Sequence, residues 1–455
     1  MGPVGRGLPR SRILTVAAIL LVLAGLWPRP ALSHGSGGGA EVLRDTEIEN
    51  DIRTLGTPIW RVAGLDAATM GIYLVNDAQL NSFVAGGQAI FLNTGLILRA
   101  QNPNMLIGVI AHETGHIVGG HVLRSLEAMK NASIETIIAM VAAVGASIAG
   151  GNGAPMMAAA GVGQRAYMNF SVAQEATADH AALNFLDRSG QSARGLLKFF
   201  EILQADEPLT GEHTDPWART HPLTVDRITY IRHHVETARS SNAPEPAGFV
   251  ELLKLIQAKL HAFLDNPSTT LAAYPESDQS LEARYARAIA YYRIPKLDKA
   301  LPAVDGLIHD FPNNPYYREL KGQMLFENGR IREAIGPYEQ AVKLAPQAML
   351  LRIELSQVYT ETNDPALNKR AIAYLNDVSR SEGRDSQVWR FLAIAYGRDN
   401  QLGMAALSLA EEALANGKKK DAMQQANRAK QSLAKNTPPY FRADDIHREA
   451  EHLDE

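Results

Sequence analysis

His112-Glu113-Thr114-Gly115-His116 decides how the first half of this chain is interpreted. The stretch has the pattern H-E-x-x-H, and the strongly apolar run 105–111 before it predicts a buried helix. Residues four apart on a helix lie about 40° apart around its axis, so the two imidazoles face the same way. This geometry suits two nitrogen ligands of one zinc ion, with Glu113 beside them as a general base. The pattern therefore predicts a zinc peptidase site that still needs a third ligand.

The H-E-x-x-H pattern needs support from its surroundings, because chance alone produces it in roughly a few per cent of chains of this composition. Two histidines and a glutamate on a buried helix are unfavourable unless a partner compensates their burial. A bound metal is the simplest such partner. We therefore expect further ligands elsewhere in the sequence.

A carboxylate ligand is expected on a second helix that contains Gln174-Glu175-Ala176-Thr177-Ala178-Asp179. Glu175 and Asp179 are four residues apart and so share one face. Glu175 is predicted to bind the zinc, and Asp179 to accept a hydrogen bond from the distal nitrogen of a ligand histidine. The alternative is a solvated acidic face, but the neighbouring alanines make this helix largely apolar. His121 is rejected as a ligand, because nine residues after His112 it lies on the opposite helix face.

The composition and the N-terminus indicate an ordered, exported protein. The 455 residues are 46% hydrophobic and 21% charged, which fits two or three domains, and the absence of cysteine excludes disulfides and thiol catalysis. Three arginines precede the uncharged run Ile13–Trp27, and Ala31-Leu32-Ser33 is a small-x-small cleavage pattern. Residues 1–33 are therefore predicted to be a signal peptide, with an uncleaved anchor as the alternative.

The net charge argues against nucleic acid as a partner. Cleavage after Ser33 would change it from -4 to -8, because four arginines and no acidic residue are removed. An acidic protein repels the phosphate backbone, so no nucleic-acid binding is expected.

The fold class is predicted to be α+β in the first domain and all-α in the second. Residues 34–245 are expected to form a mainly helical, zincin-like metallopeptidase domain with a small sheet, and the metal-binding helix starts at about Asn104. Short strands are expected at residues 72–75, 83–84 and 89–93. A break rich in Ser, Asn and Pro at residues 240–246 marks the domain boundary.

Residues 246–455 are predicted to form a superhelix of tetratricopeptide repeats. Their period is 34 residues, which is typical of these helical hairpins, and small residues or prolines recur at this spacing. The pairs are Ala300 and Ala334, Pro312 and Pro346, Ala288 and Gly322, and Ala371 and Ala405. Gly417 to Ala422 indicates a last, degenerate repeat. Such arrays form concave surfaces for proteins or peptides, and an unrelated helical bundle is the alternative.

Three stretches together resemble one peptidase family. They are Ala111-His112-Glu113-Thr114-Gly115-His116 with His121, Glu175-x-x-Ala178-Asp179, and Asn81-Ser82-Phe83-Val84-x-Gly86-Gly87. This set resembles the gluzincin family of the CAAX prenyl protease and HtpX. The signal peptide and the repeats are similar to those of its soluble periplasmic, BepA-type branch. The resemblance is close over about residues 45–235 and covers the repeats in architecture only. The family's usual glycine after Ala178-Asp179 is absent, which puts the local helix packing in doubt.

The resemblance implies further site residues. His221, in Arg219-Thr220-His221-Pro222-Leu223, would reach the zinc as a fourth ligand and hold the enzyme latent. Arg227 is a weaker candidate for stabilising the oxyanion. An extended substrate is expected to pair with the strand that contains Ala89, Ile90, Phe91 and Leu92.

The expected function is that of a periplasmic metalloendopeptidase with one Zn²⁺ per chain. By resemblance, its substrates are unfolded or misassembled outer-membrane proteins, and the repeats dock the client or the outer-membrane assembly machinery. The alternative is a chaperone or scaffold that acts mainly through the repeats. The apolar insert Asn131 to Gly163 is interpreted as a helical hairpin near the cleft, with peripheral contact to a membrane as the alternative.

Overall fold

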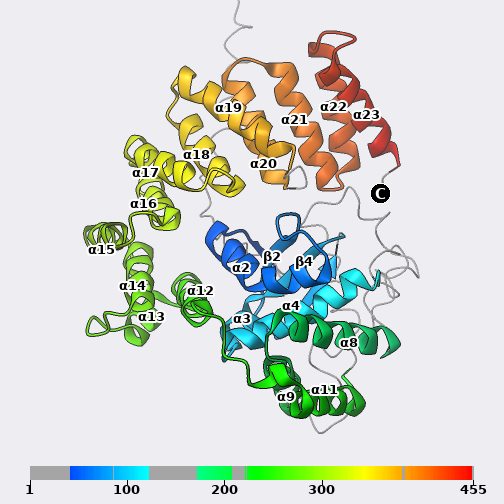
Figure 1. The fold of residues 1–455 in the computed structure, drawn as a ribbon. Coiled ribbons are helices and arrows are strands. Elements are labelled where there is room, and N and C mark those ends of the chain that lie inside the picture. Colours follow the sequence, from blue (N-terminus) through cyan, green and yellow to red (C-terminus); the bar gives the residue numbers. More distant parts are fainter. Residues whose placement is uncertain are drawn as a thin grey trace, which may run out of the picture. The chain divides into compact units, whose positions relative to one another are not determined.

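The structure is a computed structural model that describes residues 41–85, 87–121, 172–206, 221, 223–381 and 385–452. The predicted signal peptide and the insert 131–163 lie outside these residues. The described chain is mostly helical with one small sheet near its start, as predicted (Figure 1). Within the described ranges, every helix is too short or too polar to span a bilayer.

Within the described part of the chain, the sheet has four strands in the order β1-β2-β4-β3, so β3 and β1 are its edge strands there. Strand β4 pairs with β2 in parallel and with β3 antiparallel, and β1 pairs with β2 antiparallel. The three expected strands are confirmed, whereas β1 is too short to give a sequence signal. The bounds are β1 Glu41–Leu43, β2 Gly71–Asn76, β3 Ser82–Ala85 and β4 Ala89–Asn93.

The sheet order corrects the prediction that β4 pairs with a substrate. This strand lies between β2 and β3, so its backbone hydrogen-bonding groups are used on both sides. Burial of Ala89, Ile90, Phe91 and Leu92 does not distinguish β4 from β3, whose four residues are buried as well, so the strand order decides. Pairing with substrate through these residues is therefore wrong, and β3 is the edge strand on this side of the sheet.

Six α-helices of the described residues accompany the sheet, and α4 packs against most of them. Asn102 caps α4 by accepting a hydrogen bond from the Met105 backbone, and Pro103 fits its first turn. Residues 103–116 are all buried, because α4 packs against α2, α8, α9 and β3. The predicted buried helix is confirmed. The bounds are α2 Thr46–Ala63, α3 Thr94–Arg99, α4 Pro103–Val118, α8 Val172–Ser189, α9 Arg194–Asp206 and α11 Val225–Thr237.

The 34-residue period reappears as equivalent positions in successive hairpins. Ala300 and Ala334 each lie three residues after the first residue of their helices, and both are fully buried. Gly322 must be small, since a Cβ there would lie 2.6 Å from the Tyr338 ring. The helices are α12 Phe249–Leu264, α13 Pro267–Ala273, α14 Leu281–Arg293, α15 Leu297–Asp310, α16 Pro315–Glu327, α17 Ile331–Leu344, α18 Met349–Glu361, α19 Pro365–Ser379, α20 Ser386–Arg398, α21 Leu402–Ala415, α22 Lys419–Ser432 and α23 Pro438–Glu451.

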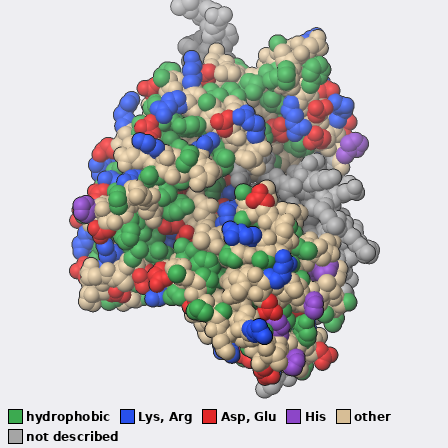
Figure 2. Space-filling model, viewed as in Figure 1, with side chains coloured by type: hydrophobic (Ala, Val, Ile, Leu, Met, Phe, Trp, Pro, Cys, Tyr) green, Lys and Arg blue, Asp and Glu red, His purple; other side chains and the backbone are tan. Residues whose placement is uncertain are grey.

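Charges of both signs are intermingled on the face of the molecule that Figure 2 shows. On the face in Figure 2, Lys and Arg side chains are interspersed with Asp and Glu among the coloured residues.

Helix α12 contacts the peptidase helices as well as the first repeat helices. The Gln257 side chain donates to the carbonyls of Ile97 and Ala100 at the end of α3, at 2.9 Å each. Lys259 forms ion pairs with Asp45 at 2.8 Å and Glu47 at 2.9 Å at the start of α2. The predicted domain boundary lies between residues 245 and 246. Helix α12, which follows this boundary, therefore packs against helices of the peptidase domain as well as against repeat helices.

Candidate metal centre

Close packing of α4 against α8 brings the predicted ligands together. Gly115, inside the H-E-x-x-H motif, faces the backbone of Ala178, and a Cβ at residue 115 would lie 2.6 Å from the Ala178 carbonyl oxygen. The glycine therefore lets the helices approach until Glu175 reaches the two motif histidines. The glycine that the family usually has after Ala178-Asp179 is absent here, but the contact between α4 and α8 is kept. In the segment that follows, His180 points outward to Tyr230, whereas Ala182 and Leu183 are buried.

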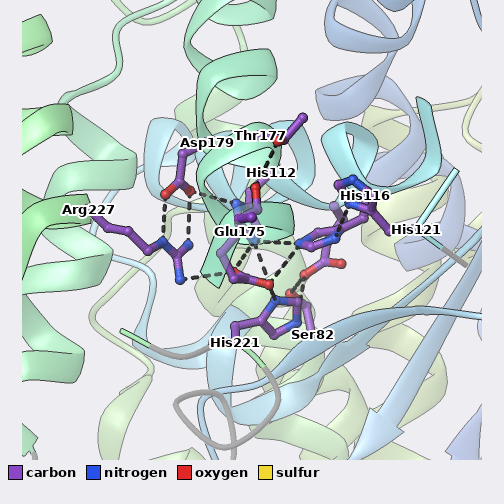
Figure 3. Close-up of polar contacts among 11 residues, drawn as sticks. Ser82, His112, His116, His121, Glu175, Thr177, Asp179, His221 and Arg227 are labelled. Carbon is purple, nitrogen blue, oxygen red and sulfur yellow. Dashed lines mark hydrogen bonds and ion pairs between the residues drawn. The ribbon is translucent and has the colours of Figure 1, made fainter. Parts of the chain in front are cut away.

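Four side chains converge on one point, as Figure 3 shows. His112 Nε2 lies 3.1 Å from His116 Nε2, and Glu175 Oε1 lies 3.3 Å from His116 Nε2. His221 Nδ1 lies 3.0 Å from Glu175 Oε1 and 3.4 Å from His112 Nε2. One donor atom from each residue falls within 4.8 Å of all the others, and all four side chains are fully buried.

These distances fit a tetrahedral metal ion. Donors that bind zinc at about 2.0–2.1 Å in tetrahedral geometry lie about 3.4 Å from one another. Five separations between nitrogen and oxygen atoms of these four side chains are 3.0–3.4 Å. Three imidazoles and one carboxylate are also a donor set that zinc prefers. The residues present therefore fit the metal that the motif predicts.

The distal nitrogens of both motif histidines also have partners. His112 Nδ1 lies 2.9 Å from Asp179 Oδ1, the contact expected from the sequence. His116 Nδ1 lies 3.0 Å from His121 Nδ1. Helix α4 ends at Val118, and Gly120 adopts a positive φ of 64°, so the chain folds back and His121 does not continue the helix. His121 therefore orients a ligand and is not one itself, and Gly119-Gly120 was the sequence signal for this turn.

The Arg227 side chain is engaged by two carboxylates. Its Nε and Nη2 donate to the two oxygens of Asp179 at 2.6 and 2.9 Å, and Nη1 lies 2.9 Å from Glu175 Oε2. The guanidinium is buried and lies 4.9 Å from the centre of the Phe200 ring. These contacts favour a role in orienting Asp179 and Glu175 over the predicted contact with an oxyanion.

Burial and hydrogen bonding set the ionisation of the ligands. Burial lowers the pKa of His116 to about 3, so its imidazole is neutral, the form that binds a metal. Burial also lowers the pKa of His112, but hydrogen bonds with Asp179 and Glu175 outweigh this effect and raise it to about 9. Burial raises the pKa of Glu175, but the charge of His221 and hydrogen bonds with the three histidines bring it well below its usual value. Glu175 is therefore ionised.

Glu113 lies beside the ligands and is held by strand β3. The Ser82 hydroxyl donates to Glu113 Oε1 at 2.7 Å, and both side chains are fully buried. Burial raises the pKa of the Glu113 carboxyl above its usual value. A carboxyl with a raised pKa can both accept and return a proton near neutral pH. The contact with Ser82 had no sequence signal, because it joins residues 31 positions apart.

Comparisons with known proteins agree with this geometry. The sequence matches peptidase family M48 over residues 46–235 and the tetratricopeptide repeat over residues 270–364. It is 23% identical over 385 residues to the beta-barrel assembly-enhancing protease of Yersinia pestis, which covers 82% of this chain and 77% of the relative. The corresponding Escherichia coli protein is 24% identical over 383 residues, or 81% of this chain and 77% of the relative.

A shorter E. coli protein, metalloprotease YcaL, is 27% identical over 172 residues, or 37% of this chain and 62% of the relative. The family match covers the residues that carry the metal centre, and the repeat match begins after α12. The chain is therefore a metalloendopeptidase whose catalytic domain belongs to peptidase family M48 and is followed by tetratricopeptide repeats.

Proposed function

We propose that the chain is a zinc-dependent endopeptidase of the periplasm that degrades unfolded or misassembled outer-membrane proteins. The convergence of His112, His116, Glu175 and His221 at zinc-like separations is the observation that carries this proposal. The names of the relatives support the client class, because they refer to beta-barrel assembly. The N-terminal signal-like sequence supports the compartment.

In the proposed reaction, different residues bind the metal, transfer the proton and orient the ligands. His112, His116 and Glu175 hold the metal, and a bound zinc ion supplies Lewis-acid polarisation of the water and the scissile carbonyl. Glu113 takes the proton of the attacking water and returns it to the leaving amine. Asp179 and His121 fix the orientation of the two motif imidazoles.

The outer edge of β3, which faces away from β4 and pairs with no other described strand, is proposed to hold the substrate backbone. Asn93 N–H donates to Asn81 O, and Phe83 opposes Phe91, so odd-numbered residues of β3 direct their backbone groups toward β4. The N–H and C=O groups of Ser82 and Val84 consequently point to this outer edge. A substrate strand paired there would be recognised by its backbone, which suits unfolded clients of varied sequence.

His221 is proposed to be a latency switch. Its Nδ1 completes a four-donor set, whereas catalytic zinc sites keep one position open for water or substrate. His221→Ala is expected to raise the cleavage rate of unfolded casein about tenfold or more, if the open form is a tenth or less of the population. His180→Ala, which removes an exposed histidine bonded to Tyr230, is the control. An unchanged rate in a fully zinc-loaded His221→Ala protein would exclude the switch.

The repeats are proposed to dock the client or its assembly machinery at the outer membrane, since tetratricopeptide arrays form concave protein-binding surfaces. A chaperone or scaffold that acts through the repeats with a latent metal site is the second candidate. Neither candidate requires the insert 131–163 to contact a membrane.

Metal removal tests the proposed function most directly. The purified protein is expected to contain one zinc per chain, to lose casein cleavage on treatment with a chelator, and to regain it when zinc is added. Elemental analysis and gel-based cleavage assays give the readouts, with an unfolded outer-membrane β-barrel protein as the second substrate. Cleavage that continues in protein shown to be metal-free would refute the endopeptidase assignment to this site.

A further inference from the structure

Ser82 belongs to the edge strand β3 and also contacts the general base, Glu113. It is the first residue of β3, and its hydroxyl donates to Glu113 Oε1 at 2.7 Å. Its side chain and that of Glu113 are both fully buried. The same residue directs its backbone N–H and C=O to the outer edge of β3, because the hydrogen bond from Asn93 N–H to Asn81 O and the register place the bonded pairs at odd-numbered residues. One residue therefore contacts both the proposed substrate position and the base.

The Ser82 hydroxyl restricts rotation about the terminal torsion of the Glu113 side chain. The terminal torsion of a glutamate is broad, so an unrestrained carboxylate presents its oxygens over a wide range of directions. Ser82 has a single hydroxyl hydrogen, and donating it to Oε1 fixes the plane of the Glu113 carboxylate. Among the residues that the structure describes, Glu113 Oε2 is buried and has no hydrogen-bond partner. Oε2 is thus the oxygen left to accept the proton.

We propose that Ser82 is a positioning residue that orients Glu113 for proton transfer and links the base to the strand that holds the substrate. The inference rests on the proposed peptidase function. The Ser82 hydroxyl donates its hydrogen bond to Glu113, so we place its action through the base. A purely structural role, in which the hydroxyl only satisfies a buried carboxylate, would instead appear in stability and leave the chemical step unchanged.

The test compares Ser82→Ala with a matched buried serine. Ser192 is also buried, and its hydroxyl donates to the Ser241 carbonyl at 2.8 Å, outside the site. In the zinc-loaded full-length chain, Ser82→Ala is expected to lower kcat for a fluorogenic casein peptide about tenfold and leave KM within about twofold. Ser192→Ala should leave both constants unchanged. Ser82→Thr, which keeps the hydroxyl, should restore most of kcat.

Two measurements other than activity separate positioning from damage to the fold. Zinc affinity, measured by competition with a chromophoric chelator, should be the same in Ser82→Ala and the parent chain. The melting temperature of Ser82→Ala should fall no further than that of Ser192→Ala. The inference is overturned if kcat of Ser82→Ala stays within twofold of the parent, or if its loss accompanies a loss of zinc affinity. If Glu113→Gln also remains active, the proposed function itself has failed, which is a separate outcome.

Discussion

Glu113→Gln is expected to reduce peptide cleavage by about 10²–10⁴-fold, the range that removal of a general acid–base group produces. The amide has nearly the shape of the carboxylate, and the Ser82 hydroxyl can still donate to its oxygen. It cannot accept a proton from the attacking water at neutral pH. The zinc ligands His112, His116 and Glu175 are unchanged, so metal content should remain at the parent level.

The measurement is the initial rate of cleavage of unfolded casein by the Glu113→Gln protein, with zinc content determined on the same sample. Glu201→Gln is the control, because Glu201 is an exposed residue of α9 that pairs with Arg232 on the surface. Its rate should equal that of the parent. A Glu113→Gln protein that retains zinc and more than a tenth of the parent rate would show that another group acts as the base.

Arg227→Met is expected to lower the free energy of unfolding of the metal-free protein by about 3–5 kcal/mol, as found when one partner of a buried ion pair is removed. Arg227 is 3% exposed and pairs with both Asp179 and Glu175. Methionine fills much of the same space but leaves two buried carboxylates without their cation. The affinity for zinc should fall as well, since Asp179 would no longer be fixed against His112.

Urea unfolding followed by tryptophan fluorescence measures this loss. Arg232→Met on the same helix is the matched control, because the Arg232 and Glu201 side chains are 45% and 39% exposed and such a pair contributes about 0–1 kcal/mol. Equal midpoints for the two variants would contradict the prediction.

The effect of Arg227→Met should also depend on pH. Burial raises the pKa of Asp179, but hydrogen bonds from His112 and Arg227 outweigh burial and hold it below the usual value of 3.8. A carboxylate with a lowered pKa stabilises the fold above its unfolded-state pKa, and this contribution is lost as the pH falls below it. The difference between Arg227→Met and the parent should therefore be largest near neutral pH and shrink in acid.

Periodicity in the sequence was sufficient to predict the ligand helices. His112 and His116, and likewise Glu175 and Asp179, are spaced by four residues, and a helix places such pairs on one face whatever it packs against. The 34-residue period similarly predicts which small residues occupy equivalent positions in successive hairpins. These spacings are local features of the chain, so a single sequence is enough to recognise them.

The order of the strands and the hydrogen-bond partners of the metal ligands could not be predicted, because they depend on contacts between residues far apart in the sequence. The apolar runs at residues 83–84 and 89–93 predicted β3 and β4 but could not tell which was the edge strand, because that depends on the pairing of β4 with β2. The contacts of Ser82 with Glu113 and of Arg227 with Asp179 join residues 31 and 48 positions apart. His121 was placed on a continued helix, whereas two glycines end the helix before it.

The ion pairs of Lys259 limit how freely the two domains can be exchanged during evolution. Lys259 is 5% exposed and faces Asp45 and Glu47, and the Tyr285 hydroxyl donates to Glu47 as well. A repeat array taken from another chain without this lysine would leave acidic side chains buried beside each other at the start of α2. The peptidase domain and its repeats must therefore diverge as a pair, each substitution at residue 45 or 47 calling for a matching change in α12.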